Sequence, residues 1–448
     1  MKKYFLLLPI LLSFGCKKYL DAKPDEHLVL PKDNIENLQL LLDDTYTMNG
    51  NVPASSEVGS DNFQLSDQQW LNLKQRSESA ANLYIWGKNL FNDNDFNDYT
   101  LSYQCVFNAN VVLDAVDLVQ GADVTQKNAV KGEALFFRSF TFYNLLQEFA
   151  KTYQPGSAAT DPGIVLKLSA DITEKVQRAS VKESFEQVIN DLKLALALLP
   201  GSVQFNTRPT KAAALGLLAR VYLTAGEYNQ AMTYAQQYLA TSPALIDYND
   251  LSGAVSYPIP MYNAEVTFNA KLSSITSFAT SFARISDELY GLYDINDLRR
   301  NIFFKNGGPG NITFRGSYYG QRSPFAGIAT DEVYLILAEC YARNEDIANA
   351  MLNLNKLLIK RWRLGMFVPV DASNKSEALK QIILERRKEL VFRNLRWSDL
   401  RRYNLEADYK QTLIRKVNGQ LYQLSPGDGG YVYPLPLKVI ELGGLVQN

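Results

Sequence analysis

Two polar segments of this sequence carry flat aromatic side chains among hydrogen-bonding groups, a combination suited to sugars. A sugar presents apolar C–H faces, which pack on aromatic rings, and hydroxyl groups, which need donors and acceptors. The segments are residues 60–86 and 290–322. The side chains predicted to contact a ligand are Asp61, Asn62, Trp70, Tyr84, Trp86, Tyr293, Tyr318, Tyr319 and Arg322. For each aromatic residue, packing inside the fold is the alternative role, and no motif decides between the two.

Residue types that enzymes commonly need are scarce in this chain. His27 is the only histidine and precedes the predicted fold, so no histidine is available to activate Cys105 or Cys340. The run "NGGPGN" at 306–311 indicates a turn, because no predicted strand and helix frame it as a phosphate loop. The run "NDNDFND" at 92–98 offers hard oxygen ligands but lacks the spacing of a calcium-binding EF-hand. We therefore predict no catalytic residue, no metal site and no cofactor.

Paired carboxylates leave one catalytic alternative open. A glycosidase needs two carboxyl groups about 5–10 Å apart. Asp61, Asp67, Asp93, Asp95 and Asp98 all lie in the N-terminal part of the chain, but no motif pairs any two of them. A surface glycoside hydrolase is therefore kept as an alternative to a binding protein.

The N-terminus has the pattern of a secretory signal that ends at a cysteine. Lys2 and Lys3 precede an apolar run, residues 4–14, that is shorter than the roughly 20 residues needed to cross a bilayer. Small residues precede Cys16, although Ser13 stands where leucine is usual three positions before a lipidated cysteine. We predict a signal peptide over 1–15 and lipidation of Cys16. An ordinary signal with an incidental cysteine is the alternative.

Composition places the rest of the chain among globular proteins. The 448 residues are 46% hydrophobic and 21% charged, with 46 Lys and Arg against 47 Asp and Glu. No basic excess points to nucleic acid. No other apolar stretch reaches membrane-spanning length, so a lipid at Cys16 would be the only membrane attachment. Cys105 and Cys340 lie in apolar helical patterns, and we expect buried free thiols more than a disulfide.

Helical periodicity dominates the chain, and one pattern occurs twice. The stretch 211–243 resembles a tetratricopeptide repeat, with small Ala219 and Ala231 on facing helices and Gly226 between them. The stretch 332–361 has Leu, Ala and Tyr at the same offsets, far along the sequence. Because the two copies are not adjacent in sequence, we expect a helical scaffold with insertions and not a continuous array.

The remaining segments are less regular. We expect a tether over 16–35, an N-terminal helical region over 36–243 and a C-terminal region over 244–448. Residues 51–80 are polar and predict a long loop. Residues 244–325 have a sequence typical of short strands and turns. A single long helix is predicted over 376–404. Its arginines alternate with acids, which favours ion pairs on a packed helix over a phosphate site.

Several stretches, taken together and in order, resemble the SusD/RagB family of outer-membrane nutrient-binding lipoproteins of Bacteroidetes. They are "CKKYLD", "GEALFFRSFTFYNLL", "RASVKESFEQVINDLKLALALLP", "RPTKAAALGLLARVYLTAGEYNQA", "YLILAECYARNED", "ERRKELVFRNLRWSDLRRYN" and "YPLPLKVIELGGLVQN". The resemblance covers essentially the whole chain after the signal. It implies a mostly α-helical fold, with a tetratricopeptide-like scaffold and an irregular ligand-binding face of loops and short strands.

The resemblance also implies a function, a partner and a location. Members of the family bind glycans or other nutrients without catalysis and deliver them to a SusC-like TonB-dependent β-barrel transporter. The expected location is the outer membrane, anchored by lipid and exposed at the cell surface. Besides the glycosidase, a tetratricopeptide adaptor for protein partners is the second alternative. The sequence does not identify the ligand as a particular glycan or a peptide.

Overall fold

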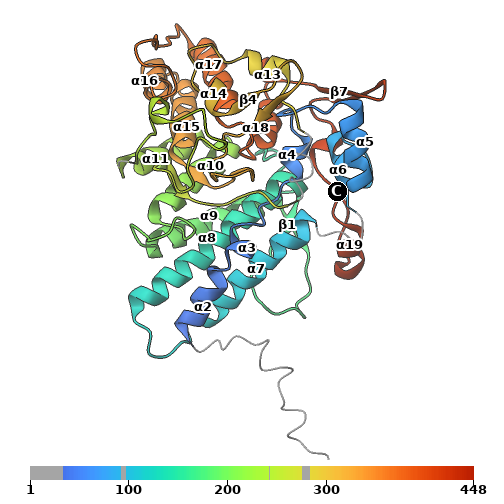
Figure 1. Cartoon of the computed structure of the whole chain (residues 1–448). Coiled ribbons are helices and arrows are strands. Elements are labelled where there is room, and N and C mark those ends of the chain that lie inside the picture. The colour runs from blue at the N-terminus through green and yellow to red at the C-terminus, as the bar shows by residue number, and fades with distance from the viewer. Residues whose placement is uncertain (1–33, 92–96, 242, 275–282) are drawn as a thin grey trace, which may run out of the picture.

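The mostly helical prediction is confirmed by a computed structural model of the chain (Figure 1), which describes residues 34–448 except 92–96, 242 and 275–282. The helices before the first repeat are α2 (Ile35–Leu42), α3 (Thr45–Met48), α4 (Ser55–Gly59), α5 (Asp67–Arg76), α6 (Glu78–Tyr84), α7 (Asp98–Ala115), α8 (Val124–Phe149) and α9 (Val181–Leu198). Helix α9 begins with a capping box, in which Ser180 and Glu183 satisfy each other's backbone N–H groups. Local capping thus fixes where this long helix starts.

Both repeat-like units form the expected helical hairpins. The first is α10 (Lys211–Thr224) with α11 (Tyr228–Ala240), and the second is α15 (Thr330–Arg343) with α16 (Ile347–Leu358). Gly226 makes the first turn with a φ of +77°, and Ala219 and Ala231 are fully buried between the helices. Although the two units are far apart in the sequence, they meet in space, because α11 packs directly on α15. Buried Arg220 of α10 also pairs with Glu332 of α15 at 2.6 Å, so the hairpins form one layer.

Short antiparallel strand pairs and turns complete the fold. The strands are β1 (Pro162–Val165) with β2 (Arg178–Ser180), β3 (Val266–Phe268) with β6 (Ile328–Ala329), β4 (Phe304–Asn306) with β5 (Ile312–Phe314), and β7 (Leu413–Val417) with β8 (Gln420–Leu424). The other helices are α13 (Asp287–Gly291), α14 (Arg299–Ile302), α17 (Lys375–Glu389), α18 (Arg396–Tyr403) and α19 (Leu437–Gly443), with 3₁₀ turns at Tyr248–Asp250, Ala407–Tyr409 and Gly429–Tyr431. In Figure 1 the repeat helices α11 and α16 lie on the side of the molecule away from α5, α6 and β7.

The long loop predicted over 51–80 is wrong, since this stretch forms α4, α5 and the start of α6. Its polar residues act as helix caps: Ser66 and Gln69 form a capping box for α5, and the Ser77 hydroxyl accepts the N–H of Ala80 in α6. Leu73 of α5 is fully buried. Polar composition therefore described the helix ends and exposed faces of this region, not an irregular chain.

The single helix predicted over 376–404 is two helices, α17 and α18, separated by a break. Asn374 caps α17, but Phe392 and Asn394 in the break have φ angles of +56° and +61°. Asn394 is held there by two contacts with the N-terminal part: its N–H donates to Glu57 at 3.0 Å and its side chain to the Pro53 carbonyl at 3.0 Å. Tertiary contacts thus overcome the local helical pattern.

The arginines of this region form ion pairs, as the sequence favours. Arg386 pairs with Asp399 at 2.8 Å, and both side chains are buried. Glu385 and Glu389 pair with the fully buried Arg299, at 2.6 and 2.9 Å. Arg401 differs from the prediction, because it donates to backbone carbonyls at the end of α8, where helix carbonyls lack partners.

The two cysteines of the described chain are buried free thiols, as expected. Burial raises the pKa of the Cys105 thiol to about 12, so it is unreactive at neutral pH. No helix within the described ranges has both the length and the apolarity to span a membrane. Cys16 lies outside the described residues, as does most of the predicted tether.

Glu133 of α8 gives the fold an expected pH dependence. Burial raises the pKa of this carboxyl to about 7, although Gln39 donates to it at 2.6 Å and Arg208 lies at 4.0 Å. Unfolded, the group ionises near pH 4.5, so between pH 4.5 and 7 the folded chain binds more protons and loses stability as pH rises. We expect Glu133→Gln to be more stable than the parent by about 1–3 kcal/mol at pH 8 and equal to it at pH 4.

Denaturant unfolding at a series of pH values measures this difference. Glu186→Gln is the matched control, because its carboxylate is mostly exposed and only 3.9 Å from Lys182 on the same helix. A Glu133→Gln variant that follows the parent at every pH would show that Glu133 is ionised in the folded chain at no cost.

Candidate ligand-binding site

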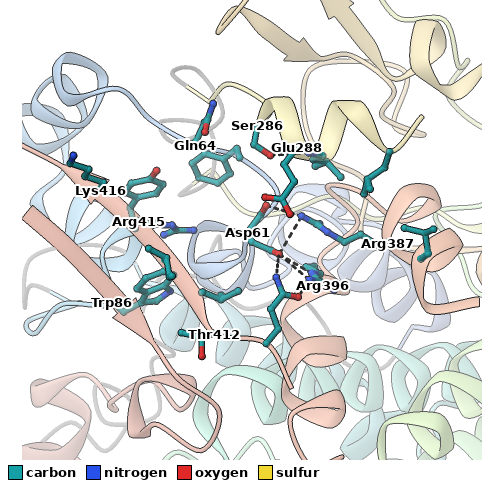
Figure 2. Close-up of a pocket in the computed structure, with 18 of the residues that line it drawn as sticks. Asp61, Gln64, Trp86, Ser286, Glu288, Arg387, Arg396, Thr412, Arg415 and Lys416 are labelled. Atoms are coloured by element: carbon teal, nitrogen blue, oxygen red, sulfur yellow. Dashed lines mark hydrogen bonds and ion pairs between the residues drawn. The ribbon is translucent and has the colours of Figure 1, made fainter. Parts of the chain in front are cut away.

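A cavity with a volume of about 730 Å³ includes predicted contact residues in its lining and is bordered by α6, α13, α17 and β7 (Figure 2). We call it the Asp61 cavity. Its lining comprises Asp61, Phe63, Gln64, Leu65, Tyr84, Trp86, Ser286, Glu288, Leu289, Leu292, Lys380, Ile383, Leu384, Arg387, Arg396, Tyr409, Gln411, Thr412, Leu413, Ile414, Arg415 and Lys416. Four stretches far apart in the sequence therefore meet around one space.

Asp61 lies at the centre of the polar side of the cavity. Arg396 of α18 binds its carboxylate through both oxygens, at 2.7 and 2.9 Å, and Gln411 donates to it at 3.2 Å. Arg387 of α17 lies 3.4 Å from the same carboxylate and donates to the Asp61 carbonyl at 2.7 Å. Burial alone would raise the pKa of Asp61, but the charges of Arg387 and Arg396 outweigh it and hold that pKa well below its ordinary value. Asp61 is therefore a fixed anion.

The opposite side of the cavity is aromatic and is organised by Arg415 of β7. The guanidinium carbon of Arg415 lies 3.9 Å from the ring centre of Tyr84 and 4.5 Å from that of Trp86. The same guanidinium donates to carbonyls at the C-terminal end of α4, including Val58 at 3.2 Å. Arg415 thus stacks on the two rings and fixes the hairpin against α4.

Trp86 is held in an unusual backbone conformation at the edge of this wall. Its φ is +54°, which for a bulky side chain costs about 1–3 kcal/mol. The indole N–H donates to the Gly59 carbonyl at 2.9 Å, and the side chain is half-buried. Strain of this kind persists where surrounding contacts enforce it and is concentrated at ligand sites.

The arrangement can bind a polar ligand with apolar faces. Trp86 offers a ring to the cavity, while exposed Gln64, Glu288, Lys380 and Gln411 offer donors and acceptors at its rim. No group of three or more His, Cys, Asp or Glu placed to hold a metal occurs in the described part of the chain. The site is therefore suited to recognise hydroxyl-rich or charged groups beside an aromatic surface.

Of the predicted contact residues in 60–86, Asp61, Tyr84 and Trp86 line this cavity. Asn62 does not line the cavity. It is fully buried, its side chain donates to Glu57 and accepts from Arg387, and it therefore holds the Arg387 side chain in position. Trp70 is a correction as well, because its ring is buried between α5 and α6 and its indole N–H donates to the Ala81 carbonyl at 3.2 Å. An amphipathic helix buries this tryptophan where the sequence suggested an open loop.

The predicted contact residues in 290–322 are not brought into the Asp61 cavity. Tyr293 and Tyr318 are each only 1% exposed, and their hydroxyls bond to the Lys388 carbonyl and the Glu265 carboxylate, both at 2.8 Å. They serve the core, which corrects the expectation that they face a ligand. Tyr319 is half-buried under the Lys271 ammonium, which lies 5.6 Å from its ring centre. Arg322 is exposed and lines a different cavity.

Sequence reasoning missed the residues that complete the Asp61 cavity, Arg387, Gln411, Arg415 and Lys416. The last two lie on β7 of a hairpin whose turn is Asn418–Gly419, with φ angles of +51° and +73°. Asn-Gly between alternating residues is the strongest short-range signal for a hairpin, so the strand was detectable in "TLIRKVNGQLYQL". Its position opposite Trp86 was not.

Comparisons with known proteins agree on one family. A model described as "Starch-binding associating with outer membrane" (SusD-like) matches residues 18–223, and the SusD/RagB model, described as "SusD family", matches residues 316–448. Among curated proteins, SusD-like protein P2 of Formosa agariphila is 26% identical, over 68% of this chain and 70% of that protein.

Solved structures share the fold over nearly the whole chain. A SusD superfamily protein from Bacteroides thetaiotaomicron has a TM-score of 0.73 at 20% identity, covering 93% of this chain and 99% of that one. A putative sugar binding protein from Bacteroides vulgatus has a TM-score of 0.74 at 22% identity, covering 93% and 98%. A laminarin-binding SusD-like protein has a TM-score of 0.66 at 18% identity, covering 92% and 97%. The chain belongs to the SusD family, whose members are carbohydrate-binding proteins associated with the outer membrane.

Proposed function

We propose that this protein is a non-catalytic, cell-surface lipoprotein that binds a glycan in the Asp61 cavity and delivers it to a SusC-like TonB-dependent transporter. The observation that carries the proposal is the composition of that cavity, in which Trp86 lines one side and a fixed aspartate–arginine cluster the other. A sugar ring can pack on the indole while its hydroxyls reach the charged groups. The structural neighbour that binds laminarin supports a glycan as the ligand class.

A direct test is titration of the mature chain with soluble oligosaccharides, including laminarin and starch fragments, followed by calorimetry. We expect saturable binding of at least one glycan with no change in its length during incubation. Release of shorter products by the purified protein would support the glycosidase instead. Binding of peptides but of no glycan would contradict the proposed ligand class.

The electrostatics of the cavity favour binding over hydrolysis. A glycosidase needs one carboxyl group that stays protonated to act as the acid. Asp61 cannot fill that role, because Arg387 and Arg396 keep its pKa low. Burial does raise the pKa of nearby Glu57, but this carboxyl is 1% exposed and is occupied by Asn62 and Asn394. Glu57 does not line the cavity, so it is not placed to act as that acid on a substrate there.

Delivery to a transporter is proposed from the family and from the shape of the chain. Nothing in the described residues could itself span a membrane as a helix. In Figure 1 the repeat helix α11 lies on the side of the molecule away from α6 and β7, so contact through it would leave the side of the Asp61 cavity that they border open to a ligand. Helical repeats commonly provide such docking surfaces. We propose that the lipid at Cys16 keeps both proteins in one membrane and raises their effective concentration.

Membrane attachment and partnership can be tested together. An affinity-tagged copy, expressed from its native locus, is expected to fractionate with the outer membrane and to recover a TonB-dependent barrel after detergent extraction. Cys16→Ser should move the protein to the soluble fraction and abolish recovery of the barrel. A Cys16→Ser copy that stays in the membrane would contradict the lipid anchor. Recovery of several soluble proteins without a barrel would favour the adaptor.

A further inference from the structure

A second cavity, of about 410 Å³, lies beside the Asp61 cavity and is strongly basic. We call it the Arg315 cavity. Arg284, Lys305, Arg315 and Arg322 line it together with the rings of Phe314 and Phe392, and none of the described residues of its lining is Asp or Glu. In a chain with 47 acidic and 46 basic residues, this excess of cations among the described residues of one cavity requires an explanation.

Three of these cations have no ionic partner. Among the residues that the structure describes, no carboxylate lies within 4 Å of Lys305, Arg315 or Arg322. The Arg315 guanidinium donates only to backbone carbonyls, those of Val255 at 3.1 Å and of Asn301, and its buried Nε has no partner. Burial lowers the pKa of Arg315, and no described carboxylate offsets this cost. An anion bound in this cavity would offset the cost of burying the Arg315 charge.

The cations are carried by a defined scaffold. Lys305 of β4 lies directly opposite Thr313 of β5 in the ladder of this hairpin, and Arg315 follows immediately after β5. The Arg315 N–H donates to the Phe303 carbonyl at 2.7 Å, which extends the pairing by one step. An ammonium, a hydroxyl and a guanidinium are therefore presented from one rigid element, the combination that recognises carboxylate and sulfate oxygens.

The two cavities share a wall. Gln64 of the Asp61 cavity and Arg284 of the Arg315 cavity are joined by two backbone hydrogen bonds, of 2.7 and 3.1 Å. A row of stacked aromatic rings also runs between the two cavities. The ring centre of Phe63, which lines the Asp61 cavity, lies 6.1 Å from that of Phe392, and the ring centre of Phe392 lies 4.7 Å from that of Phe314. A ligand longer than one sugar can thus meet both cavities in sequence.

We propose that the Arg315 cavity binds a negatively charged unit, a uronic acid or a sulfated sugar, of a glycan whose neighbouring units occupy the Asp61 cavity. This inference rests on the proposed glycan-binding function and specifies the ligand class. Arg322, Arg315 and Lys305 hold the anionic group, and half-buried Phe314, which is backed by the buried ring of Phe392, contacts the apolar face of the same sugar.

The test compares acidic oligosaccharides with neutral counterparts of the same backbone. The probes are oligogalacturonides and their carboxyl-reduced forms, carrageenan oligosaccharides and their desulfated forms, and neutral laminarin fragments, each titrated into the mature chain. We expect one acidic class to bind at least about tenfold tighter than its neutral counterpart, as one charge-assisted contact supplies. Which class shows the preference distinguishes carboxylate from sulfate. Raising the salt from about 25 to 300 mM should weaken only the acidic ligand appreciably.

The double variant Lys305→Gln with Arg322→Gln removes two exposed cations of the cavity and should reduce the preference to less than about threefold. Binding of the neutral fragments should not change. Lys211→Gln with Lys356→Gln removes two exposed cations elsewhere and should retain the full preference. Neutral glycans bound as tightly as acidic ones, or a preference that survives the double variant, would overturn this inference and leave the proposed function standing. Failure to bind any of the glycans would count against both.

Discussion

Arg361→Met is expected to lower the free energy of unfolding by about 3–5 kcal/mol, because it removes the shared cation of two buried carboxylates. Arg361 is fully buried. Its Nε lies 2.7 Å from Glu389 of α17, and one terminal nitrogen lies 2.9 and 3.0 Å from the two oxygens of Glu265. Methionine fills much of the volume of the arginine but leaves Glu265 without its nearest positive charge. The loss is therefore electrostatic more than a loss of packing.

The position of Arg361 makes the effect large. It joins the segment before β3, which carries Glu265, to α17, which carries Glu389, and it also donates to the Ile246 carbonyl at 2.9 Å. Burial raises the pKa of Glu265 to about 7 even with the arginine present, so removal of Arg361 should drive Glu265 to take up a proton. The destabilisation should then be larger at pH 8 than at pH 5.

Lys360→Met is the matched control, since it removes a cation from the neighbouring position. Lys360 pairs with Asp247 at 3.1 Å, but both side chains are substantially exposed, so the change should cost less than about 1 kcal/mol. Denaturant unfolding of both variants, followed by tryptophan fluorescence and circular dichroism, provides the measurement. Equal stability of the two variants would mean that the buried network tolerates an unpaired carboxylate.

Trp86→Leu is expected to weaken glycan binding by about 1–3 kcal/mol, the range for removal of an aromatic anchor at a desolvated contact. Leucine keeps an apolar side chain at this position. Its backbone, like that of tryptophan, is strained at a φ of +54°, so the strain is similar in the parent and in the variant. What is lost is the flat ring that lines the Asp61 cavity and its hydrogen bond to Gly59. Calorimetry with the glycan that binds the parent gives the change in affinity.

Trp362→Leu is the control for this substitution, because Trp362 is also half-buried but packs near Phe367, outside both cavities. Its affinity should match that of the parent. Thermal unfolding of both variants separates binding from stability. A large fall in the melting temperature of Trp86→Leu with unchanged affinity would assign Trp86 to the fold and not to the ligand.

The sequence by itself determined the features that depend on neighbours along the chain. Ser180 with Glu183, and Asn374 before α17, predict their helix starts because capping is satisfied within four residues. Ala219, Gly226 and Ala231 predict the first repeat because close helix packing and a left-handed turn demand small residues at those spacings. The same local signals, read along the whole chain, were sufficient for the family.

The tertiary structure alone decided which polar and aromatic side chains reach a ligand. Trp70, Tyr293 and Tyr318 lie in the same two predicted ligand-binding segments as Trp86 and Arg322, yet they are buried, because burial depends on which distant segment packs above a residue. Asp61 owes its fixed charge to Arg387 and Arg396, and Arg396 lies 335 positions away in the sequence. Hydrophobic periodicity indicates that one face of a helix or strand is buried, but it does not indicate which segment buries it. The cavity therefore follows from long-range packing and charge pairing, which no local pattern encodes.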